Sequence, residues 1–99
     1  MKIIEFETDV NMNMSSLQGH IKTTYDKLVE LFGKPTYLDA DPYEKVNAEW
    51  SVMADTDEGR VRFSIYNWKT GSVPTDDYEW HIGGYGFDAV DAAYEIING

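Results

Sequence analysis

Residues 46–68 read VNAEWSVMADTDEGRVRFSIYNW. Apolar side chains fall on every second residue in the first nine positions of this segment and again in the last nine. Between them, DTDEG at residues 55–59 has the Asp and Gly residues that favour a tight hairpin turn. This pattern predicts two antiparallel strands whose sheet covers a core on one side only. We expect Trp50 and Phe63 to lie in that core.

A helix is predicted before the hairpin. In TYDKLVELFGKP the apolar residues recur at i, i+3, i+4 and i+7, which indicates one apolar helix face over residues 24–32. Either of the two threonines before Tyr25 is suited to cap the helix start. Gly33 favours a left-handed helix end, and Pro35 prevents the helix from continuing.

The other segments complete an α+β fold. We expect a strand over 2–8, a loop or short second strand over 11–19, an acidic connection over 37–45, a loop over 69–77, a third strand of the sheet over 78–82, a glycine break over 83–86 and a helix over 87–97. The order is therefore β-α-β-β-β-α. It favours a single domain, residues 1–99, in which two helices pack on one face of an antiparallel sheet.

Charge narrows the classes of partner. The chain has 18 Asp and Glu against 8 Lys and Arg, a net charge of −10. Such a surface repels nucleic acid and anionic membranes and favours a basic protein partner, although solubility alone also explains it. The start, MKIIEFETDV, lacks the apolar run of a signal peptide, and no stretch is apolar enough to span a membrane. We expect a cytoplasmic protein.

No catalytic or metal-binding motif stands out. DTDEG resembles the start of a calcium loop, but its glycine comes one position early and the last ligand position is Tyr66. His20 and His81 are the only histidines, there is no cysteine, and no metal-ligand spacing is present. His81 is expected to point away from the face of its neighbours Trp80 and Ile82. We therefore predict no enzyme activity, no cofactor and no metal site.

The glycine-rich turn at residues 83–86 precedes a predicted helix, which is the setting of a phosphate-binding loop. Asp88 and Asp91 would occupy the positive end of that helix and repel an anion. A plain glycine turn is the better interpretation.

Two groups of side chains are candidates for partner binding. Eight acidic residues in predicted loops could converge at one end or edge of the sheet: Asp39, Asp41, Glu44, Asp55, Asp57, Glu58, Asp76 and Asp77. The second group is aromatic and lies on the sheet face opposite the helices: Tyr66, Trp68 and Tyr78, beside Met53. Exposed aromatic patches mark binding surfaces. The alternative for the acidic group is that these residues are simply solvated, as loop residues usually are. The alternative for the aromatic group is that the N-terminal segment covers it.

Three stretches resemble a family of small uncharacterised proteins from tailed-phage genomes: residues 23–35, 45–71 and 80–84. Together they cover about half of the chain. The resemblance implies a phage origin but no activity, and no functional residues come with it. The order of helix, GKP and strands is also loosely similar to that of small outer-membrane assembly lipoproteins, whose lipobox cysteine is missing here.

These features favour a non-enzymatic acidic interaction protein. It would bind a basic host or defence protein in the host cytoplasm, and one form of this function is that of a nucleic-acid mimic or inhibitor. A small-molecule-binding domain, with a pocket between the sheet and the 83–86 turn, is one alternative. A structural virion component is another.

Overall fold

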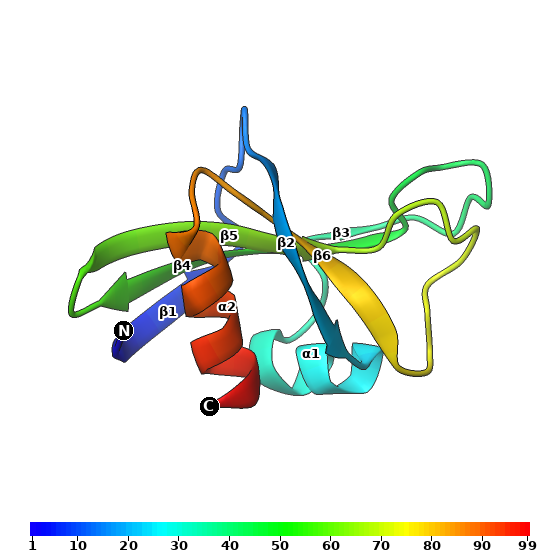
Figure 1. The fold of residues 1–99 in the computed structure, drawn as a ribbon. Helices are drawn as coiled ribbons and strands as arrows, with labels where there is room; N and C mark the ends of the chain where they lie inside the picture. The colour runs from blue at the N-terminus through cyan, green and yellow to red at the C-terminus, as the bar shows by residue number, and fades with distance from the viewer.

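The computed structural model describes residues 1–99 as one α+β domain (Figure 1). Its elements are β1 (Ile3–Thr8), β2 (Ser16–Thr23), α1 (Tyr25–Phe32), β3 (Tyr37–Leu38), β4 (Ala48–Thr56), β5 (Gly59–Tyr66), β6 (Tyr78–Gly84) and α2 (Asp88–Asn98). All strand pairs are antiparallel, and the sheet order is β1-β4-β5-β6-β2, with β3 paired to the start of β4. Both helices lie on one face of the sheet (Figure 1). We call the opposite face the outer face.

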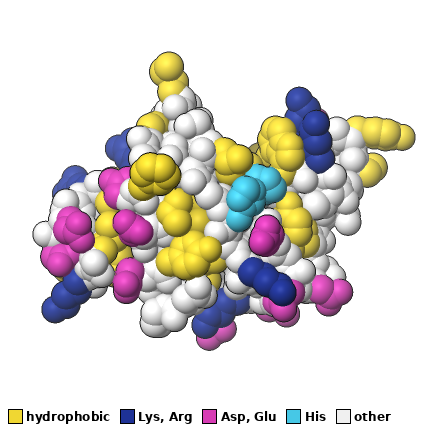
Figure 2. Space-filling model, in the orientation of Figure 1, with side chains coloured by type: hydrophobic (Ala, Val, Ile, Leu, Met, Phe, Trp, Pro, Cys, Tyr) yellow, Lys and Arg dark blue, Asp and Glu magenta, His cyan; other side chains and the backbone are white.

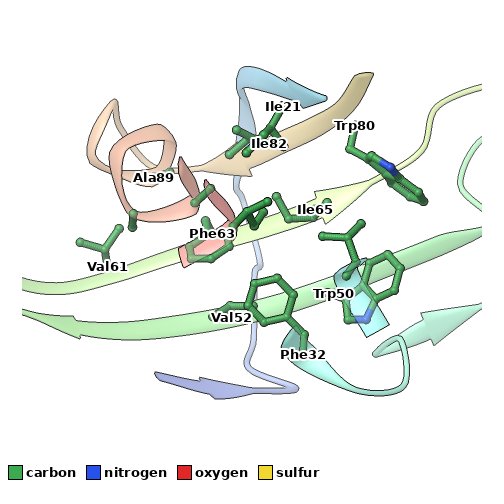
Figure 3. Close-up of a cluster of buried hydrophobic side chains, with 14 of the residues drawn as sticks. Ile21, Phe32, Trp50, Val52, Val61, Phe63, Ile65, Trp80, Ile82 and Ala89 are labelled. Carbon is green, nitrogen blue, oxygen red and sulfur yellow. The ribbon is translucent and has the colours of Figure 1, made fainter. Parts of the chain in front are cut away.

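The predicted hairpin forms the centre of the sheet. β4 and β5 pair in continuous register around the two-residue loop Asp57–Glu58, and Val52 lies opposite Phe63. Trp50 and Phe63 are fully buried, as their alternation predicted. Figure 3 shows them among the apolar side chains of the neighbouring strands and helices. Phe32 of α1 contacts the Phe63 ring at 6.2 Å between centroids, and Trp50 contacts Trp80 at 5.6 Å. One core therefore unites the sheet and both helices.

The caps of α1 are those expected from the sequence. The Thr24 hydroxyl accepts a hydrogen bond from the Lys27 amide at 3.1 Å. Gly33 has a φ of 80°, and its amide donates to the Val29 carbonyl at 2.8 Å. The Trp50 indole then donates to the Gly33 carbonyl at 2.9 Å, which joins the helix end to the sheet.

The structure adds strands to the predicted order. β2 is a full edge strand of eight residues, of which only its last five, beginning with Gly19, pair without a register shift. β3 adds two residues within the predicted acidic connection. Gly83 and Gly84 are part of β6 and do not break it, so that part of the prediction is wrong. Gly84 is required there because an added Cβ would lie 2.4 Å from the Ala89 Cβ of α2.

The connection between β1 and β2 crosses the outer face, where Figure 1 shows it rising on the side opposite the helices. The Asp9 amide donates to the Ser51 carbonyl at 2.9 Å, and Arg62 donates to the Asn11 carbonyl at 3.3 Å. Ser51 and Ser64 lie side by side on the outer face and are buried. The connection therefore divides this face into a half near the β4–β5 turn and a half near the other end of these strands. None of the helices is long and apolar enough to cross a membrane.

Candidate functional site: a row of aromatic and charged side chains on the outer face

The eight acidic candidates do not all converge: Asp39, Asp41, Glu44, Asp76 and Asp77 precede strands that start at one end of the sheet, and the other three lie at its opposite end. Asp55, Asp57 and Glu58 lie at the β4–β5 turn, whereas the loop with Asp39, Asp41 and Glu44 precedes the far end of β4. The nine residues of β4 put about 30 Å between these two places. Asp76 and Asp77 lie just before Tyr78, which pairs with Thr23 at the end of β2. Figure 2 shows acidic side chains at the turn end of the molecule and others beside and below the histidines, with no single acidic patch.

The acidic side chains of the turn have partners within the chain. Asp55 forms an ion pair with Arg60 at 3.0 Å, and Asp57 accepts a hydrogen bond from the Lys2 amide at 2.7 Å. Glu58 lies 3.3 Å from the N-terminal ammonium, and this hydrogen bond raises the pKa of the ammonium group. Asp57 and Glu58 hold the start of β1 against the hairpin, whereas the Asp55 ion pair lies within the hairpin. The sequence did not predict these contacts, although Asp57 and Glu58 remain exposed to solvent.

Five outer-face side chains from five strands form one continuous row. Cross-strand pairing aligns them in the order Tyr37 on β3, Glu49 on β4, Tyr66 on β5, His81 on β6 and His20 on β2. Directly opposed side chains in antiparallel pairs have Cβ atoms about 4.5–5.5 Å apart, so each member contacts the next. We call this set the outer row. Only Tyr66 among these five belonged to the predicted partner-binding residues.

The two histidines meet at one end of the row. The His20 and His81 ring centroids are 4.6 Å apart, and Tyr66 stacks on the other side of His81 at 5.4 Å with an interplanar angle of 28°. Burial, and next the proximity of His20, lower the pKa of His81, which favours the neutral imidazole. Its Nδ1 is buried without a hydrogen-bond partner. His81 does point away from Trp80 and Ile82, as predicted, but the meeting with His20 was missed because β2 was not recognised.

Trp68 extends the row toward the loop that contains Asp39–Glu44. Its side chain is exposed and contacts Tyr66 at 6.3 Å between ring centroids. The ammonium groups of Lys45 and Lys69 each lie 5.9 Å from the Trp68 ring centroid. The backbones of these two lysines are joined by a hydrogen bond of 2.7 Å. The aromatic half of the outer face and the acidic loop are thus neighbours.

Two other aromatic-site predictions need correction. Tyr78 packs against Trp80, at 5.3 Å between ring centroids, on the core side of β6. Its hydroxyl accepts a hydrogen bond from the Trp68 amide at 3.1 Å, and its ring centroid lies 6.5 Å from that of His81. Met53 is on the outer face but lies beyond Ser51, in the half near the β4–β5 turn. Neither belongs to the outer row.

Glu49 is the one acidic member of the outer row. Its side chain is partly buried between those of Tyr37 and Tyr66, and it is in neither of the chain's ion pairs. Burial raises the pKa of Glu49, and no hydrogen bond or nearby cation offsets that effect. Burial, and then the charge of Glu49, raise the pKa of Tyr66. The Glu49 carboxylate is partly shielded from water and has no hydrogen-bond donor within the chain, which makes it a candidate contact for a cation.

The half of the outer face near the β4–β5 turn carries two shallow depressions. One, of about 300 Å³, is lined by Glu5, Phe6, Glu7, Met53, Asp55 and Arg60. The other, of about 350 Å³, is lined by Met53, Arg60, Val61, Arg62, Tyr85 and Asp88. The second lies next to the predicted 83–86 turn, where a small-molecule pocket was one alternative. At that turn, α2 begins with Asp88 and Asp91 in its first turn.

No three His, Asp or Glu side chains are placed to hold one metal ion. Comparisons with protein-family models, with curated proteins and with solved structures gave no match. Function is therefore inferred from the outer row and its surroundings.

Proposed function

We propose that the chain is a non-enzymatic protein-binding module that takes a basic protein partner on the aromatic half of its outer face. The observation that carries this proposal is the outer row. Five strands of a rigid sheet present aromatic, imidazole and carboxylate side chains side by side, and the β1–β2 connection crosses the other part of the face. Aromatic side chains are enriched in protein interfaces and supply most of their hot spots.

Charge supports a basic partner. The net charge of −10 attracts a cationic protein over a distance and speeds the encounter. Asp39, Asp41 and Glu44 flank Tyr43, which is 94% exposed at the tip of the loop beside Trp68. These acidic residues are placed to form the rim of the interface, with Tyr66 and Trp68 nearer its centre.

The identity of the partner is a further part of this proposal. The resemblance to small phage proteins favours a host or defence protein, met in the cytoplasm of the infected cell. A nucleic-acid mimic would use the acidic loop at residues 39–44, which lies beside Trp68, because the carboxylates of the β4–β5 turn lie at the other end of the sheet and are paired with Arg60 or the N-terminal segment. The same surface would serve a virion component that binds a neighbouring protein.

Small-molecule binding is the second candidate. The depression of about 350 Å³ beside Tyr85 supports it, since Arg60 and Arg62 give it two cationic side chains. This candidate uses the opposite half of the outer face, so substitutions separate the two.

Affinity capture from a host lysate, with matched variants, tests the proposal. The wild-type chain is expected to retain a basic protein, and raising the salt concentration should weaken the complex because its charges are screened. Tyr66→Ala combined with Trp68→Ala should lose that protein, while Tyr85→Ala should retain it. Capture that survives the double substitution, or that depends on Tyr85, would place binding elsewhere.

A further inference from the structure

We infer that Glu49, which the sheet register places between Tyr37 and Tyr66, forms a receptor for one arginine side chain of the protein partner. This inference rests on the proposed function and names the group that would anchor the partner. It begins from the contrast between Glu49 and the acidic residues of the β4–β5 turn, each of which has a donor within the chain.

The Glu49 carboxylate has no hydrogen-bond donor within the chain. Glu49 is partly buried in the middle of the sheet, and burial alone raises the pKa of its carboxyl group. A carboxylate removed from water is costly unless a cation or hydrogen-bond donor compensates. A donor from outside the chain would offset the free-energy cost of partly burying the Glu49 carboxylate. Binding of such a donor is favoured for that reason.

No basic side chain of the protein forms an ion pair with Glu49. Two basic side chains beside the row, Lys45 and Lys69, have their ammonium groups over the Trp68 ring. On the other side of Tyr66, the lowered pKa of His81, caused by burial and then by His20, favours a neutral ring at pH 7. The carboxylate therefore remains open to a cation from solution.

The tyrosines beside Glu49 favour arginine over lysine as the cation. Guanidinium is planar, donates two parallel hydrogen bonds to a carboxylate and stacks on aromatic faces. Tyr37 and Tyr66 are directly opposite Glu49 in the register, one on each side. The stacking on His81 holds the plane of the Tyr66 ring. A carboxylate between two aromatic rings thus matches arginine better than lysine, whose ammonium is a compact, strongly hydrated charge.

An NMR titration of the full chain with N-acetyl-arginine amide tests this inference without the partner. We expect saturable shifts centred on Glu49 and Tyr66. N-acetyl-citrulline amide, which has nearly the same shape but no charge, should bind at least about tenfold more weakly, because a hydrogen bond to a charged group contributes about 1.5–3 kcal/mol. Glu49→Gln should weaken arginine amide binding to the same degree. Glu7→Gln, which removes an exposed carboxylate beyond the β1–β2 connection, should leave it unchanged.

Three results would overturn the inference: equal binding of the citrulline compound, unchanged binding in Glu49→Gln, or equally tight binding of N-acetyl-lysine amide. Its failure is distinguishable from failure of the proposed function. If the captured protein is lost by the Tyr66 and Trp68 substitutions but bound normally by Glu49→Gln, the interface stands and the arginine site is wrong. If arginine amide binds at Glu49 but the Tyr66→Ala, Trp68→Ala variant still retains the captured protein, the arginine site is correct and the proposed interface is wrong.

Discussion

His20 and His81 lie opposite each other on β2 and β6, with ring centroids 4.6 Å apart. The Tyr94 hydroxyl donates to the His20 carbonyl at 2.7 Å and ties this point of the edge strand to α2. Within this contact His81 is flanked by His20, Tyr66 and Glu79, of which Glu79 alone raises its pKa while burial and His20 lower it. Protonation of His81 therefore acts directly on the attachment of β2.

Stability is predicted to fall on acidification from pH 7.5 to 5.5. The pKa of His81 is lowered in the folded state, mainly by burial, from its ordinary value of 6.5. Between these two pKa values the unfolded chain binds more protons, so the free energy of unfolding rises with pH in this window and declines as pH falls through it. Thermal unfolding at several pH values measures the slope. His81→Gln should flatten it, and an unchanged slope in that variant would remove His81 as the cause.

Phe63→Ala is predicted to lower the free energy of unfolding by about 3–5 kcal/mol, because the fully buried ring contributes both apolar burial and packing. Phe87→Ala is the matched control. Its ring is 82% exposed, and the change should stay within about 0.5 kcal/mol. Urea unfolding of both variants compares the two costs. Similar costs at the two positions would contradict the assignment of the core.

Gly33→Ala should destabilise the chain by about 1–2 kcal/mol, the penalty of a Cβ in left-handed backbone. Nothing lies within 4 Å of the added Cβ, so the cost comes from the φ of 80° and not from a clash. Lys34→Ala, at the exposed next position, is the control. Chemical unfolding should separate the two, and a neutral Gly33→Ala would refute this helix end.

Charge reversal at the β4–β5 turn is predicted to loosen β1 without affecting the partner. Changing Asp55, Asp57 and Glu58 to Lys removes the contacts to Arg60, the Lys2 amide and the N-terminus. Amide hydrogen exchange of β1 should then become faster, while exchange in β6 stays slow. Loss of partner binding with unchanged exchange in β1 would instead make the turn part of the interface.

Glu49→Gln is predicted to keep or raise the stability of the free chain. Because burial raises the pKa of Glu49, the folded state holds its proton more tightly than the unfolded state does. The stability linked to this group is fully present below its ordinary pKa of 4.5 and is lost as pH rises through the folded pKa. The neutral amide avoids that loss at pH 7. A clear fall in melting temperature at pH 7 would show that Glu49 supports the fold.

Local patterns in the sequence predicted the hairpin and α1. Alternation placed Trp50 and Phe63 in the core, and the Thr24 and Gly33 caps follow from neighbouring residues. The same alternation puts Tyr78 on the side of Trp80, so its core position was also readable from the sequence. The register of a hairpin with the two-residue loop 57–58 sets position 49 opposite position 66. The sequence was therefore sufficient to predict that Glu49 pairs with Tyr66, but this prediction was not made.

The rest of the site depends on contacts distant in sequence. β2 was not recognised because, as an edge strand, it buries little apolar surface: Ile21 is its only buried hydrophobic side chain. Without β2 the sequence does not bring His20 to His81, which is 61 positions away. The neutralisation of the turn carboxylates likewise depends on β1 returning beside β4. Such placements follow from the sheet order, which local periodicity does not determine.

The most direct test of the binding surface is a backbone NMR shift map of the isotope-labelled chain with the captured partner. We expect the largest changes at Glu49, Tyr66, Trp68 and His81 and in the loop at residues 39–44. Amides at the β4–β5 turn and around Tyr85 should keep their positions. Changes concentrated at that turn or at Tyr85, with the outer row unaffected, would contradict the account.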